Sequence, residues 1–301
     1  MLRSKENRIT QIVAHIFCGA AAMIAVLPFI LLVIGSFTDN TWAASNGFTF
    51  FPSEFSLDAY RYIGVRSDLF GRAYMMSVIV TAIGTVSSIL ITTTFAYSIS
   101  RTEVPGMKIL SFLLVFTMLF NGGLVATYYT YIRIFGIRDT IWALLVPNLL
   151  MNAFNVILVR NYYVHSIPPS LLEAARVDGA SEFRIFARIV FPLSKPIIAT
   201  VGLLTALHYW NDWQNGLYYL SARGGEHLYT IQIILNNINE NIQTLMQNAA
   251  QLAAIGATGI QFPSTTVRMA LGAIGILPII VIYPFFQQYF VKGITLGGVK
   301  E

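Results

Sequence analysis

Charge is scarce in this chain of 301 residues. Only 11% of the residues are charged, 55% are hydrophobic, and the mean hydropathy is +0.64. Soluble domains contain about 25% charged residues, so this composition excludes a soluble protein and indicates an integral membrane protein. The 19 Lys and Arg exceed the 14 Asp and Glu by a net charge of +5. With so few charges overall, this balance argues against binding to nucleic acid and for orientation in a bilayer.

Metal-binding and nucleotide-binding patterns are absent as well. The single cysteine, Cys18, lies in an apolar run, which excludes a disulfide framework and a thiolate metal cage. The four histidines, His15, His165, His208 and His227, are too scattered to indicate a metal site. The chain has no GxxxxGK[ST] loop and no nucleophile and base pair on its apolar segments, so we expect neither a cofactor in this chain nor an enzyme.

Six apolar stretches are long enough to cross a bilayer, which takes about 20 helical residues. All six are predicted as α-helices, because backbone groups in lipid need internal partners and the alternation of a barrel strand is absent. The first stretch has no small-residue cleavage site and is interpreted as a retained helix. The predicted fold is an all-α integral membrane domain over residues 1–301, with spans at about 12–37, 73–99, 109–126, 140–164, 197–220 and 269–291.

The positive charges predict the orientation of these spans. With the N-terminus inside, the inner segments collect 12 of the 19 Lys and Arg and the outer segments keep 7. Because inner loops carry the excess of Lys and Arg, both termini are predicted to be cytoplasmic. Two external connections, about 39–72 and 221–268, are long, which is typical of contact with something delivered from outside.

The inner connection 165–196 is predicted to form helix, glycine and helix. Ser170 and Glu173 have the spacing of a capping box, and Gly179 tolerates a positive φ. Ser181 is expected to cap a second helix before Pro192 ends it, with an apolar face of Phe183, Phe186, Ala187 and Val190. One interpretation of this amphipathic pair is an anchor in the lipid headgroups, and the other is a handle for a partner.

Residues in this connection resemble the EAA loop of ABC importer permeases. The matching residues are Glu173-Ala174-Ala175, Asp178-Gly179-Ala180, Phe186, Ile189 and Pro192. Nearly the whole chain is similar to the carbohydrate-uptake, maltose-permease-like branch, and more closely to permeases for oligosaccharides and polysaccharide fragments. This similarity is found in Phe120-Asn121-Gly122-Gly123, Arg160-Asn161, WNDW at 210–213 and the ending 290–300.

The resemblance implies a type I ABC importer permease fold in a bacterial inner membrane, with 165–196 as a coupling loop seated in a cytoplasmic ATPase. Glu173 and Asp178 would present charge to the ATPase, and Phe186 would be an apolar knob. The implied coupling residues are Glu173, Ala174, Ala175, Asp178, Gly179, Ala180, Phe186 and Pro192, and the tail residues Gly297, Gly298, Val299 and Lys300 are expected near the ATPase pair.

The same resemblance implies partners for this chain. They are a second homologous permease that completes a heterodimer, two cytoplasmic ABC ATPase subunits that hold ATP and Mg, and an external or periplasmic solute-binding protein. Membrane lipid surrounds the assembly, and no nucleic acid is expected.

Polar residues in the fifth span are candidates for a substrate path, because polar groups inside a membrane are costly. His208, Asn211, Asp212 and Asn215 recur at i, i+3, i+4 and i+7, and Trp210 and Trp213 lie among them. Amide and aromatic groups together suit a sugar. The alternatives are an aromatic belt at the interface and hydrogen bonds between helices.

The fourth span carries three asparagines, Asn148, Asn152 and Asn155, at i, i+4 and i+7 after a helix-breaking Pro147. Polar contacts between helices are the favoured role for them, and sugar contact is the alternative.

Two functions therefore compete. The first is a permease subunit that imports oligosaccharides or polysaccharide fragments, alginate or pectin fragments among them, by alternating access. The second is a self-sufficient carrier or channel for a polar solute. An ion-driven carrier usually has several intramembrane charges and paired broken helices, whereas the spans hold one acid, Asp212, and show no inverted repeat, which favours the first function.

Overall fold

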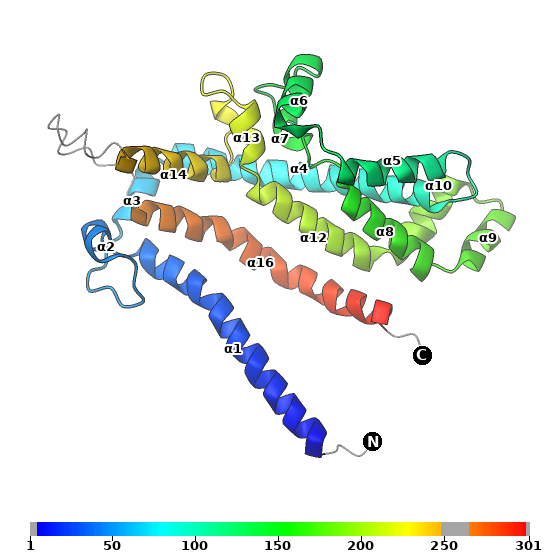
Figure 1. The fold of residues 1–301 in the computed structure, drawn as a ribbon, viewed down its shortest axis with the longest axis horizontal. Helices are drawn as coiled ribbons and strands as arrows, with labels where there is room; N and C mark the ends of the chain where they lie inside the picture. The colour runs from blue at the N-terminus through cyan, green and yellow to red at the C-terminus, as the bar shows by residue number, and fades with distance from the viewer. Residues whose placement is uncertain (1–4, 248–264, 299–301) are drawn as a thin grey trace. The chain divides into compact units, whose positions relative to one another are not determined.

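The computed structural model describes the backbone of residues 5–247 and 265–298 (Figure 1). These residues form helices joined by loops. They contain no strand, apart from one isolated antiparallel bridge between Thr38 and Phe55. The all-α prediction is therefore confirmed. The chain divides into two compact units, Met1–Phe70 with Leu235–Leu277, and Gly71–Ile234 with Pro278–Glu301.

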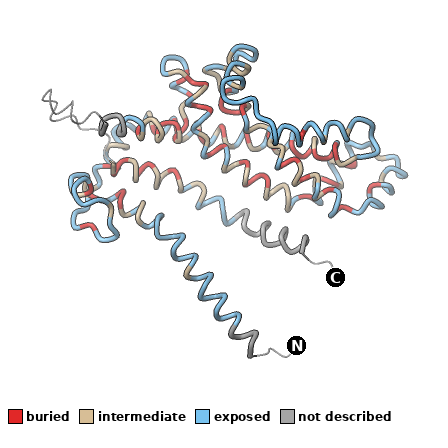
Figure 2. The backbone as a smooth tube through the Cα atoms, in the orientation of Figure 1, coloured by how far each residue is buried: buried red, intermediate tan, exposed pale blue. Residues whose placement is uncertain are grey.

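The first unit begins with α1 (Lys5–Ser36), in which no residue of the most apolar 18-residue window is buried and most are exposed (Figure 2). Two short helices follow, α2 (Asn40–Asn46) and α3 (Asp58–Val65). Asp39 caps α2, and the backbone N–H of Trp42 that donates to its carboxylate lowers the pKa of Asp39.

The second unit contains α4 (Ser67–Ser100, which begins in the first unit) and α5 (Met107–Leu119). After α5 the chain bends by 119° into α6 (Gly123–Tyr129) and the π-helix η1 (Thr130–Ile134). The predicted third span is therefore not one straight helix. Gly123 has a positive φ of 78° at the bend, and its N–H donates a hydrogen bond of 2.8 Å to the Oδ1 of Asn121.

The fourth and fifth predicted spans are also interrupted. The fourth consists of α7 (Trp142–Leu145) and α8 (Ala153–Ser166), and the fifth of α12 (Lys195–Asn211) and α13 (Gln214–Tyr219). Pro147, which lacks an N–H, precedes Asn148 at a φ of 61°, so a continuous helix is impossible at that point. The break predicted at Pro147 is thus confirmed.

The remaining helices form the inner connection and the last third of the chain. The inner connection contains α9 (Pro169–Val177), α10 (Glu182–Ile185), the π-helix η2 (Phe186–Val190) and α11 (Phe191–Leu193). Beyond α13 come η3 (Glu226–Leu228), α14 (Ile231–Gln247) and α16 (Thr265–Gly298).

Continuous helices of spanning length are fewer than the predicted spans. Among the described residues, three helices are long and apolar enough to cross a membrane by themselves, Thr10–Ser36, Ser67–Ser100 and Thr265–Pro284. Two bent pairs raise this number to five if each pair counts as one span, Met107–Leu119 with Gly123–Ile134 and Glu182–Leu193 with Lys195–Asn211. The count of six spans stays a prediction.

Two buried apolar clusters hold the second unit together. One lies where α4, α5 and α8 meet the inner connection, and it includes Val156, Val159 and Ile185. The other joins α7, α12 and α13 through residues such as Leu144, Tyr209 and Tyr219. At Gly84 a Cβ atom would lie 2.5 Å from the ring of Tyr209, so α4 and α12 approach closely only because this residue is glycine.

Candidate functional site

The inner connection folds into a helical hairpin, residues 169–193, at the right-hand end of the second unit in Figure 1. We call it the coupling hairpin, after the role that the resemblance noted in the sequence implies for it. Gly179 has a φ of 76° between its two arms, as predicted. The Oγ of Ser181 accepts a hydrogen bond of 3.4 Å from the N–H of Arg184, so the second predicted cap is confirmed.

Two details of the predicted hairpin are wrong. No capping box forms, because α9 begins at Pro169, whose missing N–H needs no cap, and Pro168 takes the N-cap position without a side-chain bond. Pro192 does not end the second arm, which continues to Leu193. The π-helical turn before Pro192 provides a wider backbone that accommodates its ring.

The inner face of the coupling hairpin packs against the helices of the second unit. Ile185 and Val190 are fully buried, and Ala175, Ala180 and Phe186 are partly buried against the same cluster. The Phe186 ring lies 5.3 Å from the ring of Tyr97 in α4. Phe186 therefore helps to seat the hairpin on α4, and its role as an apolar knob for the ATPase stays a prediction.

The outer face carries the other predicted coupling residues together with two exposed apolar residues that the sequence analysis did not select as site residues. Glu173, Ala174, Asp178 and Gly179 are exposed, as is Pro192. Val177 is 87% exposed and Phe183 is 78% exposed, on either side of Gly179. The helical spacing in the sequence predicts Phe183 on the same apolar face as Phe186 and Val190, and this position of Phe183 is wrong. The pattern of Ile185, Phe186, Ile189 and Val190 fits the buried face instead, and it leaves Phe183 outside.

A chain of polar contacts joins the hairpin to the end of α4. The hydroxyl of Tyr97 donates to Oε2 of Glu182 at 2.5 Å, and Nη2 of Arg101 donates to the same hydroxyl at 2.8 Å. Arg176 donates from Nε to Oε1 of Glu182 at 2.8 Å and from Nη2 to Glu103 at 3.3 Å. The bond from Tyr97 lowers the pKa of Glu182, partial burial raises it, and the bond from Arg176 lowers it further, with a net decrease.

A hollow of about 420 Å³ lies beside these contacts. Its walls include Arg101, Glu103, Glu173 and Arg176, so it is lined by charge of both signs.

The predicted substrate path is divided by the break in the fifth span. α12 ends at Asn211, and Asp212 is extended, so His208, Asn211, Asp212 and Asn215 do not share one continuous helical face. His208, Asn211 and Trp213 are exposed, and Asp212 is half-buried. Trp210 is 5% exposed and its ring meets that of Tyr74 edge to face at 5.6 Å. Trp210 thus packs within the protein.

Hydrogen bonds connect the breaks in the fourth and fifth predicted spans. Asn215 is 4% exposed and its Nδ2 donates to the carbonyl of Pro147 at 3.0 Å. The hydroxyl of Tyr209 donates to the carbonyl of Leu145 at 2.8 Å. Non-helical backbone at membrane depth requires such partners, so Asn215 has a structural role here.

The asparagines of the fourth span have separate environments. Asn148 is exposed, while Asn152 caps α8 by accepting a hydrogen bond of 3.2 Å from the N–H of Asn155. Asn155 is buried, and its Nδ2 lies 3.4 Å from the hydroxyl of Thr205 in α12. This last contact agrees with the favoured interpretation of polar contacts between helices. In the C-terminal tail, Gly297 and Gly298 end α16, and Val299 and Lys300 lie outside the described residues.

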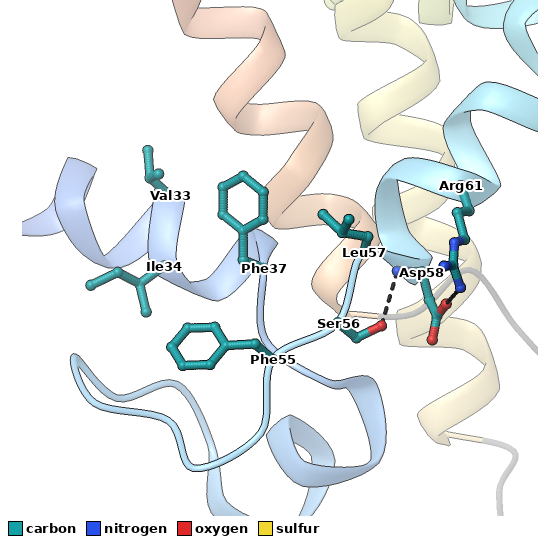
Figure 3. A pocket seen from close by; sticks show the side chains of 8 residues that line it. All are labelled: Val33, Ile34, Phe37, Phe55, Ser56, Leu57, Asp58 and Arg61. Carbon is teal, nitrogen blue, oxygen red and sulfur yellow. Dashed lines mark hydrogen bonds and ion pairs between the residues drawn. The ribbon is translucent and has the colours of Figure 1, made fainter.

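A second hollow, of about 600 Å³, lies in the first unit after α1 (Figure 3). Val33, Ile34, Phe37, Phe55 and Leu57 supply its apolar wall. On its polar side Asp58 forms an exposed ion pair of 3.2 Å with Arg61, and its N–H donates to Ser56. No residue predicted as a site from the sequence lines this hollow.

Comparison with known proteins gives consistent relatives. The permease protein YtcP of the polygalacturonan/rhamnogalacturonan transport system of Bacillus subtilis (strain 168) is 38% identical over 295 residues, which is 98% of this chain and 99% of that protein. Protein LplC of the same organism is 35% identical and covers 100% of this chain and 98% of its own length.

A solved structure is similar as well. It is a chain from the crystal structure of a bacterial ABC transporter involved in the import of the acidic polysaccharide alginate. The TM-score is 0.76 at 30% identity, with coverage of 95% of this chain and 98% of that chain. The predicted ABC importer permease fold is thus confirmed.

The family described as "Binding-protein-dependent transport system inner membrane component" matches residues 73–296, which include the coupling hairpin and the interrupted spans. This match and the relatives of similar length confirm the resemblance noted in the sequence. The chain therefore belongs to this family of membrane permease subunits of ABC importers for sugars and oligosaccharides.

Proposed function

We propose that this chain is one of two permease subunits in an ABC importer that moves acidic oligosaccharides into the cytoplasm by alternating access. The observation that carries the proposal is the coupling hairpin, whose inner face is packed on the spans while its tip stays exposed. A rigidly seated element with an exposed tip suits a chain that has no phosphate-binding loop of its own and takes its energy from a separate ATPase.

In this proposal the tip of the hairpin enters a cleft of the ATPase. Val177 and Phe183 supply apolar contact, Glu173 and Asp178 present charge, and Ala174 allows close approach. The predicted tail contact with the ATPase pair is assigned to Gly297 and Gly298 at the end of α16, together with Val299 and Lys300, which lie outside the described residues. Both termini and the hairpin then lie in the cytoplasm of a bacterium, as the distribution of Lys and Arg predicts.

The assembly consists of this chain, a second homologous permease, two ATPase subunits with ATP and Mg, and an external or periplasmic solute-binding protein. The exposed apolar surface of α1 supports a place for this chain in a lipid bilayer, because an apolar helix of this length has to be covered by lipid or by another subunit.

The substrate path is assigned to the exposed polar residues of the fifth span. His208 and Asn211 offer hydrogen-bonding groups, and Trp213 offers a flat aromatic surface for the C–H face of a sugar ring. Asp212, Trp210, Asn215 and Asn155 support the shape of this region through their packing and hydrogen bonds. Asn148 and Asn152 lie at the neighbouring break.

Two of the similar proteins support an acidic substrate class. Polygalacturonan, rhamnogalacturonan and alginate, which are named for two of the similar proteins, all contain uronic acid units. Acidic oligosaccharides of this kind are therefore favoured over neutral ones.

The test is uptake by the complete importer, reconstituted in proteoliposomes with its binding protein. Uptake of trigalacturonate, an alginate trisaccharide and maltotriose is measured in the presence of ATP and, separately, in the presence of a non-hydrolysable ATP analogue. We expect ATP-dependent uptake of an acidic trisaccharide and little uptake of maltotriose. A preference for maltotriose would overturn the substrate class, and uptake by this chain alone without ATP would overturn the importer function.

A further inference from the structure

Both covalent connections between the coupling hairpin and the membrane helices pass through a break. On one side, Ile167 and Pro168 are extended between α8 and α9. On the other side, the helical run Glu182–Leu193 meets α12 at an angle of 80°, with Ser194 between them. Such element ends absorb rotation instead of transmitting it. The backbone connections alone therefore do not fix the orientation of the hairpin.

Side-chain contacts supply a third connection, which runs directly to α4. Both oxygens of the Glu182 carboxylate are occupied, Oε2 by the hydroxyl of Tyr97 and Oε1 by the Nε of Arg176. The Tyr97 hydroxyl is itself held by Arg101, whose guanidinium also lies 4.6 Å from the centre of the Tyr97 ring. Glu182 thus joins the first arm, the second arm and the end of α4.

The far end of α4 is connected to other elements of the second unit. α4 is one unbroken helix of 34 residues, so Ser77 lies about 30 Å from Tyr97 along its axis. The buried Oγ of Ser77 accepts a hydrogen bond of 2.9 Å from the N–H of Ile231 at the start of α14. Between these ends, Gly84 lies against Tyr209 of α12. A displacement at Tyr97 therefore reaches α12 and the segment before α14.

We propose that Tyr97 and Glu182 are positioning residues that transmit the movement of the coupling hairpin to α4 through their hydrogen bond. This inference rests on the proposed importer function and adds a route that bypasses both breaks. The bond is short and charge-assisted, and it is shielded from solvent on the side of Tyr97, which is 9% exposed, while the Glu182 side chain is 54% exposed. The bond also opposes rotation of the hairpin relative to α4, which the extended Ile167-Pro168 connection leaves to its backbone dihedrals.

The competing explanation is that apolar packing alone seats the hairpin. Leu172, Ile185 and Val190 are buried in the cluster shared with α4 and α8. Tyr97→Phe distinguishes the two explanations, because it keeps the ring beside Phe186 and removes only the hydroxyl. If packing is sufficient, this variant couples like the wild type.

The test measures the number of trigalacturonate molecules taken up per ATP hydrolysed by the reconstituted importer. For Tyr97→Phe and for Glu182→Gln we expect this ratio to fall about tenfold, while ATP hydrolysis and assembly persist. The double variant should be no worse than the single ones, since both remove the same link.

The matched control is Tyr163→Phe. The Tyr163 ring lies 6.4 Å from that of Tyr97, and its hydroxyl faces the carbonyl of Thr93 at 3.5 Å instead of the hairpin. This variant should retain the wild-type ratio. An unchanged ratio in Tyr97→Phe, or an equal fall in Tyr163→Phe, would overturn the inference and leave the proposed function intact. Absence of ATP-dependent uptake in the wild type would instead overturn the proposed function, and this inference with it.

Discussion

The side-chain amide of Asn215 donates a hydrogen bond of 3.0 Å to the backbone carbonyl of Pro147. This contact connects the breaks in two neighbouring spans, 68 residues apart in the sequence. Because neither break has a complete set of helical hydrogen bonds, the contact satisfies a carbonyl that would otherwise be unpaired in a buried region. A residue that sequence spacing suggested for the substrate path thus stabilises the fold.

Replacing Asn215 by Ala should lower the thermal stability of the protein. The carbonyl of Pro147 loses its partner, which costs about 1–3 kcal/mol. Asn211→Ala is the matched control, since Asn211 is exposed at the end of α12, and its cost should stay within about 0.5 kcal/mol. Unfolding temperatures in detergent measure both variants, and equal temperatures would contradict the structural role of Asn215.

The same two variants distinguish an effect on stability from an effect on transport. We expect Asn211→Ala to reduce uptake of trigalacturonate at an unchanged unfolding temperature, because Asn211 is assigned to the substrate path. Wild-type uptake in this variant would remove Asn211 from that assignment.

Local patterns predicted the helical class and the hairpin because they depend on short-range physics. Gly179 has the positive φ that its residue type allows, and Ser181 caps the second arm. The breaks were harder to predict. A hydropathy average over a span hides single polar residues such as Asp212 and Asn148. Whether the span can be broken near Pro147 depends on hydrogen-bond donors such as Asn215 and Tyr209, which are distant from it in the sequence. The direction of Phe186 likewise depends on the position of Tyr97 in α4, which is distant in the sequence.

Gly179→Val should separate ATP hydrolysis from uptake. A β-branched residue at a φ of 76° is strained by more than about 1 kcal/mol, which distorts the tip of the hairpin. Gly179→Asn is the control, because asparagine adopts the left-handed conformation more readily. Both variants should reach the membrane in wild-type amounts, and only the valine variant should hydrolyse ATP with little uptake. Normal uptake in Gly179→Val would count against the hairpin as the coupling element.

Phe183→Asp should weaken the association with the ATPase by about tenfold or more, because in the proposed contact an aspartate replaces an exposed apolar side chain. Phe51→Asp provides a control with another exposed phenylalanine, 92% exposed against 78% for Phe183. Co-purification of the ATPase over a range of concentrations measures the effect. Equal association of both variants would show that Phe183 lies outside the contact.

The bond between Tyr97 and Glu182 should depend on pH in a defined direction. The folded protein lowers the pKa of Glu182, so its stabilising contribution is complete above the ordinary carboxyl pKa of about 4.3 and is lost as the pH falls through the lower folded-state value. The unfolding temperature of Glu182→Gln should lie below that of the wild type at pH 7, by a modest amount since the carboxylate is 54% exposed. At about pH 3 this difference should shrink, and a difference that grows toward acid would contradict the account.

The most direct measurement of the central claim is a cross-link from the tip of the coupling hairpin to the ATPase. The only cysteine, Cys18, is replaced by Ala, and a photoreactive probe is attached at Val177→Cys or, as a control, at Val65→Cys. Both valines are 87% exposed at the ends of short helices. The account predicts that, in the transporting importer, the probe at position 177 labels the ATPase and the probe at position 65 does not. Labelling of the ATPase from position 65 but not from position 177 would contradict it.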